Sequence, residues 1–322
     1  MKDIFINDEY YVCYCKNEDI RRESSSGGIF YLLAEKVIKD DGVVFAARFT
    51  ADFTVIHEKC ESVSDIHHFM GSKYLQSHIG NVFSEIRYEL NNDRKVLFTG
   101  TPCQVAGLKA YLRKVYENLI LVDFVCHGVP APLLWKKYLD EQFDGRSITK
   151  INFRNKSDGW QDFCLKIEFT DGKCYKKSQY DDLYMRGFLK NLTLRPSCYK
   201  CHFKPSQDAD ITLSDFWGVQ KLAPDFYDNK GVSLIMLHSL KGKQLFETIK
   251  QTCRYREVDL PIVKKSNPSY FHSVKKPEER QILMSSKGEE ILKVMNSLTK
   301  EKLRRKVAML VKRKFRKYLG RC

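Results

Sequence analysis

The chain has 322 residues, of which 43% are hydrophobic and 12% aromatic, and its formal net charge is +15 at pH 7. This length and apolar content suffice for a full core, which excludes an intrinsically disordered protein and predicts one large or two intermediate domains. The N-terminal segment MKDIFINDEYYVCYC has no uninterrupted apolar stretch behind a basic start, so it predicts neither a signal peptide nor a transmembrane helix. We therefore expect a cytoplasmic protein whose eleven cysteines are thiols or metal ligands rather than disulfides.

Up to about residue 145 the sequence alternates between helical and strand patterns. Helical patterns cover 29–40, 81–92, 104–114 and 131–143, and each is followed by an apolar run, at 42–49, 95–100, 119–125 and 147–153. This alternation predicts an N-terminal α/β part, residues 1–145, with a mainly parallel sheet and flanking helices. In such a sheet ligands bind at the carboxyl ends of the strands.

From about residue 146 the pattern changes. Segments 151–157, 163–170 and 173–178 indicate short antiparallel strands, because Asp158-Gly159 and Asp171-Gly172 are turn sequences. A helix over 180–192, strands over 209–218 and 232–239, and a helix over 241–251 follow. We expect a smaller α+β part with an antiparallel sheet, residues 146–260, then a linker and a basic helical tail, residues 261–322.

Four cysteines stand in polar loops directly after apolar runs or turns: Cys103 in VLFTGTPCQ, Cys126 in LILVDFVCHGVP, and Cys198 and Cys201 in LRPSCYKC. Thiolates bind iron–sulfur clusters or zinc in sets of four, and a Cys-x-x-Cys pair offers two sulfurs to one centre. The sequence thus predicts a four-cysteine metal site at one end of the sheet. Zinc, a redox dithiol at Cys198 and Cys201, and unrelated buried thiols are the alternatives.

The SSSGG segment, with Ser25, Ser26, Gly27 and Gly28, opens the first predicted helix. Exposed N–H groups at a helix start, the close approach that glycine permits and the helix dipole make an anion site that suits a pyrophosphate. Taken alone, an ordinary serine N-cap is the commoner explanation of such a segment.

A second candidate is the glycine-bounded loop MGSKYLQSHIG. It combines charge, an aromatic ring and hydrogen-bonding groups in the residues Lys73, Tyr74, Gln76 and Ser77. A plain surface loop is the alternative.

Six motifs occur in one order between about residues 24 and 239: SSSGGIF, GSKYLQS, VLFTGTPCQVAGL, VDFVCHGVP, RPSCYKCHFK and ADITLSDFWG. Together they resemble the coenzyme F420 hydrogenase/dehydrogenase beta subunit family. The resemblance implies an oxidoreductase in which FAD exchanges a hydride and a [4Fe-4S] cluster passes single electrons to or from a partner.

Carried over to this chain, the resemblance implies Cys103, Cys126, Cys198 and Cys201 as the cluster ligands. It also implies an FAD site at the SSSGG helix start and the GSKYLQS loop, with phosphates on backbone N–H groups and on Lys73. Larger members have an N-terminal ferredoxin run of the Cys-x-x-Cys-x-x-Cys type, which this sequence lacks. We therefore expect a separate electron donor or acceptor protein. The resemblance assigns no catalytic residue.

The segment 300–322 holds most of the excess of 55 Lys and Arg residues over 40 Asp and Glu residues, and its apolar residues recur at helical spacing. Such a basic amphipathic helix suits an anionic membrane surface, at the inner face of the membrane, or an acidic partner. The alternative is a helix that folds back on the domain. Nucleic-acid binding is not expected, because the excess charge is concentrated in this tail and no recognised base-reading module is present.

Two classes of function follow from the sequence. The first is a flavin- and iron–sulfur-dependent oxidoreductase. The second is a noncatalytic or zinc-binding interaction protein that retains the fold.

Overall fold

The structure, a computed structural model, describes residues 8–206, 208–286 and 290–300. The chain forms two compact units, each built from two segments. Unit 1 comprises residues 1–127 and 200–273, and unit 2 comprises residues 128–199 and 274–322. The predicted basic tail helix lies outside the described residues.

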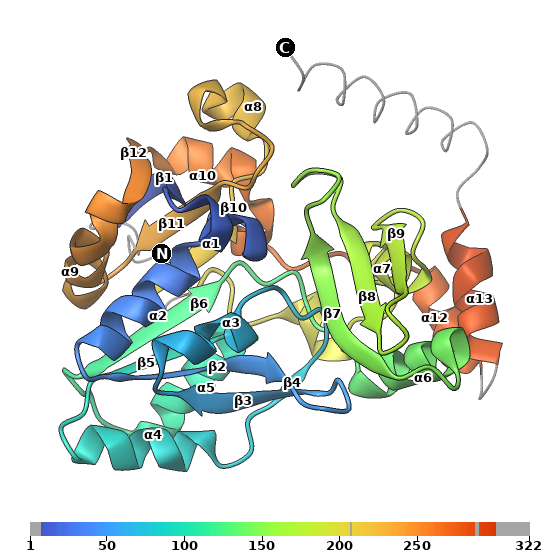
Figure 1. Cartoon of the computed structure of the whole chain (residues 1–322), viewed down its shortest axis with the longest axis horizontal. Coiled ribbons are helices and arrows are strands. Elements are labelled where there is room, and N and C mark those ends of the chain that lie inside the picture. Colours follow the sequence, from blue (N-terminus) through green and yellow to red (C-terminus); the bar gives the residue numbers. More distant parts are fainter. Residues whose placement is uncertain (1–7, 207, 287–289, 301–322) are drawn as a thin grey trace. The chain divides into compact units, whose positions relative to one another are not determined.

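A nine-stranded mixed sheet forms the centre of unit 1 (Figure 1). Its order is β12-β1-β11-β10-β6-β5-β2-β3-β4. The inner strands β10, β6, β5 and β2 run parallel, and antiparallel pairs join β10 to β11 and β2 to β3. The strands are β1 (Glu9–Cys15), β2 (Val43–Phe49), β3 (Val55–Cys60), β4 (Ser77–His78), β5 (Val96–Gly100), β6 (Leu119–Phe124), β10 (Ile211–Asp215), β11 (Ser233–Leu237) and β12 (Cys253–Val258).

Helices cover both faces of this sheet. One apolar cluster packs α2 (Ile29–Lys39) and α9 (Leu240–Ile249) on the sheet, and another packs α4 (Val82–Asn91) and α5 (Pro102–Leu112) (Figure 1). The remaining helices of unit 1 are α1 (Glu18–Glu23), α3 (Ile66–Phe69), α8 (Val219–Leu222), α10 (Leu260–Ser266) and α11 (Pro268–Phe271). The α/β fold with parallel strands at its centre confirms the expected fold class.

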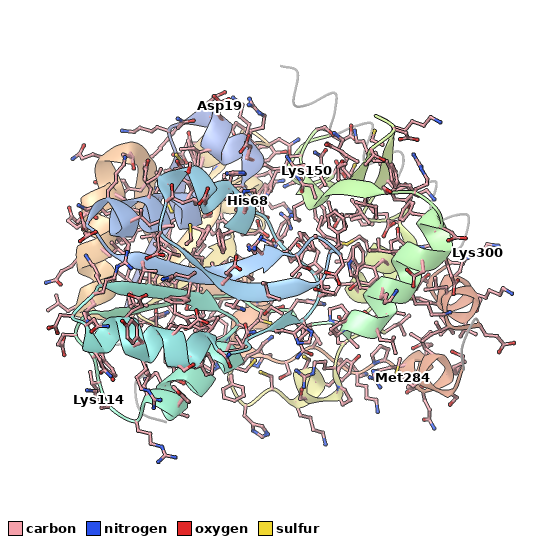
Figure 2. The ribbon with its side chains drawn as sticks, turned by 60° about the horizontal axis from the view of Figure 1, so that its bottom comes forward. Asp19, His68, Lys114, Lys150, Met284 and Lys300 are labelled. Carbon is pink, nitrogen blue, oxygen red and sulfur yellow. The ribbon has the colours of Figure 1, made fainter. Side chains whose placement is uncertain are left out.

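The helices form where the apolar stripes predict them. In α2 the residues Leu32, Leu33 and Val37 are buried, as their spacing predicts. Charged side chains such as Asp19 and Lys114 extend from the surface (Figure 2). No helix in the described ranges is long and apolar enough to span a membrane.

Unit 2 contains a three-stranded antiparallel sheet, β7-β8-β9, as predicted. Its elements are α6 (Pro132–Phe143), β7 (Ile148–Asn155), β8 (Cys164–Phe169), β9 (Cys174–Ser178), α7 (Leu183–Leu189), α12 (Glu279–Ser285) and α13 (Glu290–Thr299). The hydroxyls of Tyr138 and Tyr175 both donate to Asp182 Oδ2, and Asp182 Oδ1 accepts from the N–H of Met185 to cap α7. One buried carboxylate thus ties α6, β9 and α7 together.

Two sequence expectations differ from the structure. The helix expected from residue 104 begins at Pro102, because Thr101 and Gln104 form a capping box and proline is favoured in the first turn. Cys103 therefore lies in the first turn of α5 rather than in a loop. The strand expected over 147–153 pairs in the small sheet of unit 2 instead of continuing the parallel series.

Candidate cofactor and metal site

The SSSGG segment and the GSKYLQS loop touch each other in unit 1. Ser25 Oγ accepts hydrogen bonds from the N–H and the hydroxyl of Ser72, at 2.6 and 3.0 Å. The loop also reaches the start of α5, because Gln104 Nε2 donates to Ser77 Oγ at 2.8 Å. The two segments predicted to hold a flavin, about 45 residues apart, thus contact each other, and the second also contacts the helix that carries Cys103.

The two glycines of SSSGG have different structural roles. A Cβ on Gly27 would lie 2.7 Å from Cys13 O and 2.9 Å from Ser233 N, so this residue must be small to pack against the strands. Gly28 is left-handed, with φ 87°, and stands at the N-cap of α2 without a side-chain capping bond. The first N–H groups of α2 therefore have no capping side chain at this position, which suits an anion.

Lys73 is engaged by its own loop. Its Nζ donates to the carbonyls of Phe69, Met70 and Gly71 at 3.0, 2.9 and 3.2 Å. Burial of the amine lowers its pKa to about 7. The amine thus holds the chain at the end of α3, and an ionic contact with a phosphate would compete with these three bonds.

His57 on β3 is a buried residue of this region that sequence reasoning missed. Its Nε2 donates to Thr99 O at 2.9 Å, and its ring stacks on Phe98 at 5.4 Å between centroids. Burial, and the positive charge of Lys73, lower the pKa of His57 to about 4. The ring is therefore neutral near pH 7, and its buried Nδ1 has no hydrogen-bond partner among the described residues.

Three of the four predicted ligands belong to unit 1. Cys103 is exposed in the first turn of α5, with its sulfur 3.1 Å from Thr101 Oγ1, and Cys126 is half-buried two residues after β6. The half-buried Cys201 donates its N–H to Ser273 Oγ at 2.9 Å.

One small cavity of about 10 Å³ is lined by Cys126 and by residues close in sequence to the other two cysteines. They are Pro102, which precedes Cys103 in the first turn of α5, and Phe203, which follows Cys201 by two residues. The fold of unit 1 thus brings together three segments that are far apart in the sequence.

Cys198 belongs to unit 2, in a short 3₁₀ helix (Pro196–Lys200). The chain just after Cys126 runs beside it: Arg195 N donates to Val129 O at 3.0 Å, and Pro130 and Leu194 form an antiparallel bridge. A Cβ on Gly128, which has φ 135°, would lie 2.8 Å from Leu194 Cδ1 and 3.2 Å from Cys198 Cβ. Only glycine allows residue 128 to approach Cys198 this closely.

The four predicted ligands are accessible thiols, but the described residues do not form a metal site. The ten cysteines in the described part of the chain are thiols, and the four predicted ligands are exposed or half-buried. Five others, Cys13, Cys15, Cys60, Cys164 and Cys253, are buried, as expected for structural thiols, and Cys174 is exposed on β9. Among the described residues no group of three or more His, Cys, Asp or Glu is close enough to hold a metal ion.

Comparison with known proteins agrees with this arrangement of motifs. Residues 93–261, just over half of the chain, match the family model that describes the C terminus of the coenzyme F420 hydrogenase/dehydrogenase beta subunit. The chain belongs to the coenzyme F420 hydrogenase/dehydrogenase beta subunit family. The match includes all four predicted ligands of this F420 hydrogenase/dehydrogenase beta-subunit-like protein, and the two predicted flavin segments precede it.

A solved structure shares the fold of this beta-subunit-like protein. A chain of the xenon-derivatised F420-reducing [NiFe] hydrogenase complex from Methanosarcina barkeri superposes with a TM-score of 0.56 at 15% sequence identity. The match covers 81% of this chain and 88% of that chain. No curated protein sequence matches the chain.

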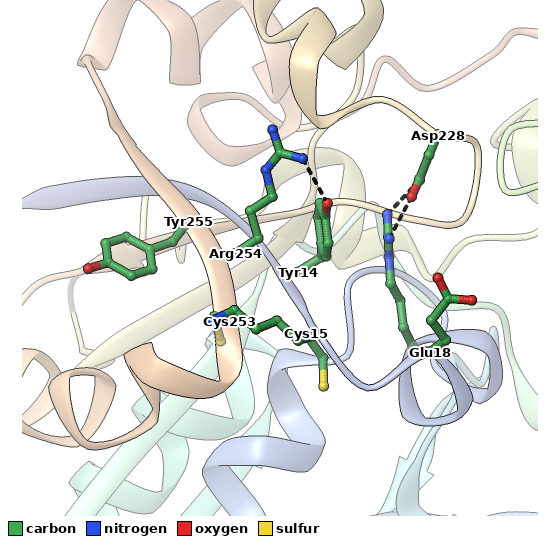
Figure 3. Close-up of a pocket in the computed structure, with 9 residues that line it drawn as sticks. Tyr14, Cys15, Glu18, Asp228, Cys253, Arg254 and Tyr255 are labelled. Atoms are coloured by element: carbon green, nitrogen blue, oxygen red, sulfur yellow. Dashed lines mark hydrogen bonds and ion pairs between the residues drawn. The ribbon is translucent and has the colours of Figure 1, made fainter.

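The larger cavity of the beta-subunit-like protein, about 520 Å³, lies elsewhere in unit 1 (Figure 3). Cys15 and Cys253 on one side and Tyr14 and Arg254 on another line it. Its wall includes Arg21, which makes a bidentate pair with Asp228 at 2.7 Å and donates to Gly231 O at 2.8 Å. These bonds occupy the guanidinium, so it stabilises the fold here. No sequence motif indicated this cavity.

Proposed function

We propose that this protein is an oxidoreductase that uses FAD and a [4Fe-4S] cluster to pass electrons between a substrate and a partner protein. The observation that carries the proposal is that three cysteine-bearing segments, one of them the first turn of α5, contribute to one cavity in a chain whose family comprises hydrogenase and dehydrogenase subunits. Cys103, Cys126, Cys198 and Cys201 would hold the cluster, which supplies one-electron chemistry.

The flavin would bind where SSSGG meets GSKYLQS. Ser25 and Ser72 already contact each other there, and the uncapped start of α2 favours a phosphate through its N–H groups and dipole. Tyr74 and Gln76 offer a ring face and an amide from the same loop. Ser26 donates to Val232 O and Gly27 N donates to Ser233 Oγ, so these residues position the segment rather than bind through those atoms.

The electron partner would be a separate protein, as in the multi-subunit hydrogenase complex that contains the structural neighbour. We propose a cytoplasmic location, with residues 300–322 as a peripheral contact to the inner face of the membrane. Their basic, amphipathic sequence supports this part of the proposal.

The test is anaerobic purification followed by an absorbance spectrum with iron, sulfide, zinc and flavin assays on one sample. We expect about four irons per chain, the stoichiometry of a [4Fe-4S] cluster, together with a flavin. Zinc without flavin would overturn the oxidoreductase and leave the zinc-binding interaction protein.

Single substitutions then test the ligands. Cys198→Ser and Cys126→Ser should remove the cluster iron. Cys174→Ser is the control, because Cys174 is exposed but lies outside the motifs, and it should leave the iron content unchanged. Equal iron content in all three variants would refute the ligand assignment.

A further inference from the structure

The two cysteines that line the larger cavity of unit 1 face each other across neighbouring strands. Cys15, at the end of β1, is the register partner of Cys253, at the start of the edge strand β12 (Figure 3). Both are thiols, and neither belongs to the four predicted metal ligands. Two thiols that are distant in the sequence thus meet in the wall of one cavity.

The hydrogen bonds around these two cysteines identify a close pair. Cys15 donates its N–H to Gly27 O at 2.7 Å, on the side away from β12, while Lys16 donates to Thr252 O at 2.9 Å. Cys15 and Cys253 are therefore a non-hydrogen-bonded pair, whose Cα atoms lie about 4.5 Å apart in an antiparallel sheet. Disulfides span Cα distances of about 4.4 to 6.8 Å, so rotation of the two side chains can join the sulfurs while the strands stay in place.

Cys13 is a third thiol on this face of the sheet, because it stands two residues before Cys15 on β1. Its register partner is Tyr255, so it is diagonal to Cys253. Diagonal neighbours in a sheet are about 7 to 8 Å apart, which is too far for a disulfide. Of these three thiols, only Cys15 and Cys253 are placed to form a bond with each other.

The two carboxylates in the cavity wall are already paired with cations. Glu18 contacts Lys230 Nζ at 2.7 Å, and Asp228 contacts the buried guanidinium of Arg21 at 2.7 Å. These pairs leave the other charged side chains of the wall to set its charge.

Those side chains, Lys16 and Arg254, are both cations. Lys16 Nζ donates to the carbonyl of Gln251 at 3.0 Å, which leaves its charge uncompensated. Arg254 shares the single carboxylate of Asp225 with Arg256, at 3.6 and 2.8 Å. A cavity of about 520 Å³ has the size of a small-molecule site, and this excess of positive charge favours a molecule that carries carboxylates.

Burial makes the two thiols slow to react. It raises the pKa of Cys253 to about 12, although the charge of Lys16 opposes the rise. It also raises the pKa of Cys15, against the N–H of Asn17 and the charge of Arg21. Each cysteine is 2% exposed, so a reagent in the cavity reaches the sulfurs when the end of the edge strand opens locally. Because the thiolate is the attacking form, we expect exchange on the order of hours.

We propose that Cys15 and Cys253 are a redox-active dithiol that a small, carboxylate-bearing disulfide oxidises from the cavity, and that the new bond fastens β12 to β1. One cysteine thiolate attacks a sulfur of the bound disulfide, which breaks that S–S bond and forms a mixed disulfide. The second cysteine loses its proton and attacks the mixed disulfide, which completes the protein disulfide. Two electrons pass from the cysteine pair to the small disulfide, which leaves as two thiols that carry the two protons. The reaction depends on neither the flavin nor the cluster.

Incubation of the purified full-length protein with oxidised glutathione, a disulfide rich in carboxylates, tests the pair. After alkylation and proteolysis, mass spectrometry should find a Cys15–Cys253 peptide pair that dithiothreitol removes. Cys13→Ala should form the same bond, whereas Cys253→Ala should stop at a glutathione adduct on Cys15. The bond should form severalfold faster with oxidised glutathione than with the cationic disulfide cystamine. Lys16→Gln combined with Arg254→Gln should abolish this preference.

Absence of the Cys15–Cys253 bond from the unaltered protein, or a bond from Cys13 to Cys253 in its place, would overturn the proposal. Equal rates with the two disulfides would refute the role of the cavity. Hydrogen exchange measures the fastening without any substitution: the amides of β12 should exchange severalfold more slowly in the oxidised protein than in the reduced protein. Equal exchange in the two states would refute this effect of the bond.

Discussion

The buried imidazole of His57 should make unit 1 sensitive to acid. Its pKa is about 4 in the fold, mainly because burial disfavours the charged ring, against an ordinary value of 6.5. Because the folded pKa is the lower one, the unfolded chain binds a proton more readily, and stability is lost as pH falls through this window. The loss integrates to about 2 kcal/mol at pH 5 and about 3 kcal/mol at pH 4.

Substitution of His57 separates its contribution to the pH dependence of stability from that of the other titrating groups. His57→Gln cannot take up a proton, so its unfolding free energy should fall less than that of the unaltered protein between pH 7 and pH 5. Urea unfolding at pH 7, 6 and 5, followed by circular dichroism, measures both proteins. His67→Gln is the control for the substitution itself, because His67 is an exposed histidine. If His57→Gln and the unaltered protein lose equal stability on acidification, the burial argument is wrong.

Two further predictions concern unit 2. Asp182→Ala removes the acceptor of one buried and one half-buried tyrosine hydroxyl and the cap of α7, and should cost about 2 to 4 kcal/mol in urea unfolding. Asp181→Ala, on the exposed neighbour, should cost much less, and equal losses would contradict the role of Asp182. Gly187→Ala would place a Cβ 2.5 Å from Met295 Sδ and 3.0 Å from Thr193 Cγ2, so we expect a loss of about 1 to 3 kcal/mol. Gly187→Ala should cost less in a Met295→Ala background, which removes the clashing sulfur, and an equal cost in both backgrounds would place the clash elsewhere.

The sequence predicted the elements whose patterns are local. The stripe of α2 and the apolar runs of β5 and β6 are unambiguous, because buried strands and amphipathic helices have different periods. β3 and β12 escaped notice, because a third of the residues of β3 and half of those of β12 are charged, and both strands lie at or near the sheet edges. Such strands are defined by their partners rather than by their own composition.

The site residues also fall into two groups, those that a local sequence pattern predicts and those that only strand pairing brings together. Cysteine motifs and glycine-rich segments have recognisable spacings, so sequence alone proposed Cys126 and Gly28. Cys15 and Cys253 stand in strand segments without a redox motif, and neither sequence context indicates the other as a partner. Their pairing depends on strand order, which joins segments about 240 residues apart. Periodicity carries no information about such lateral contacts.

The position of β1 has a consequence for biosynthesis. This strand, residues 9–15, pairs with β11 and β12, and both neighbours lie more than 215 residues further along the chain. At about 5 to 20 residues per second, β1 waits on the order of 10 to 50 seconds after its own synthesis for its second neighbour. During that time its apolar side chains, buried in the finished sheet, are available to chaperones or to other nascent chains. A message truncated before codon 253 should therefore yield an aggregating polypeptide, although it still encodes all four cysteines of the proposed metal site.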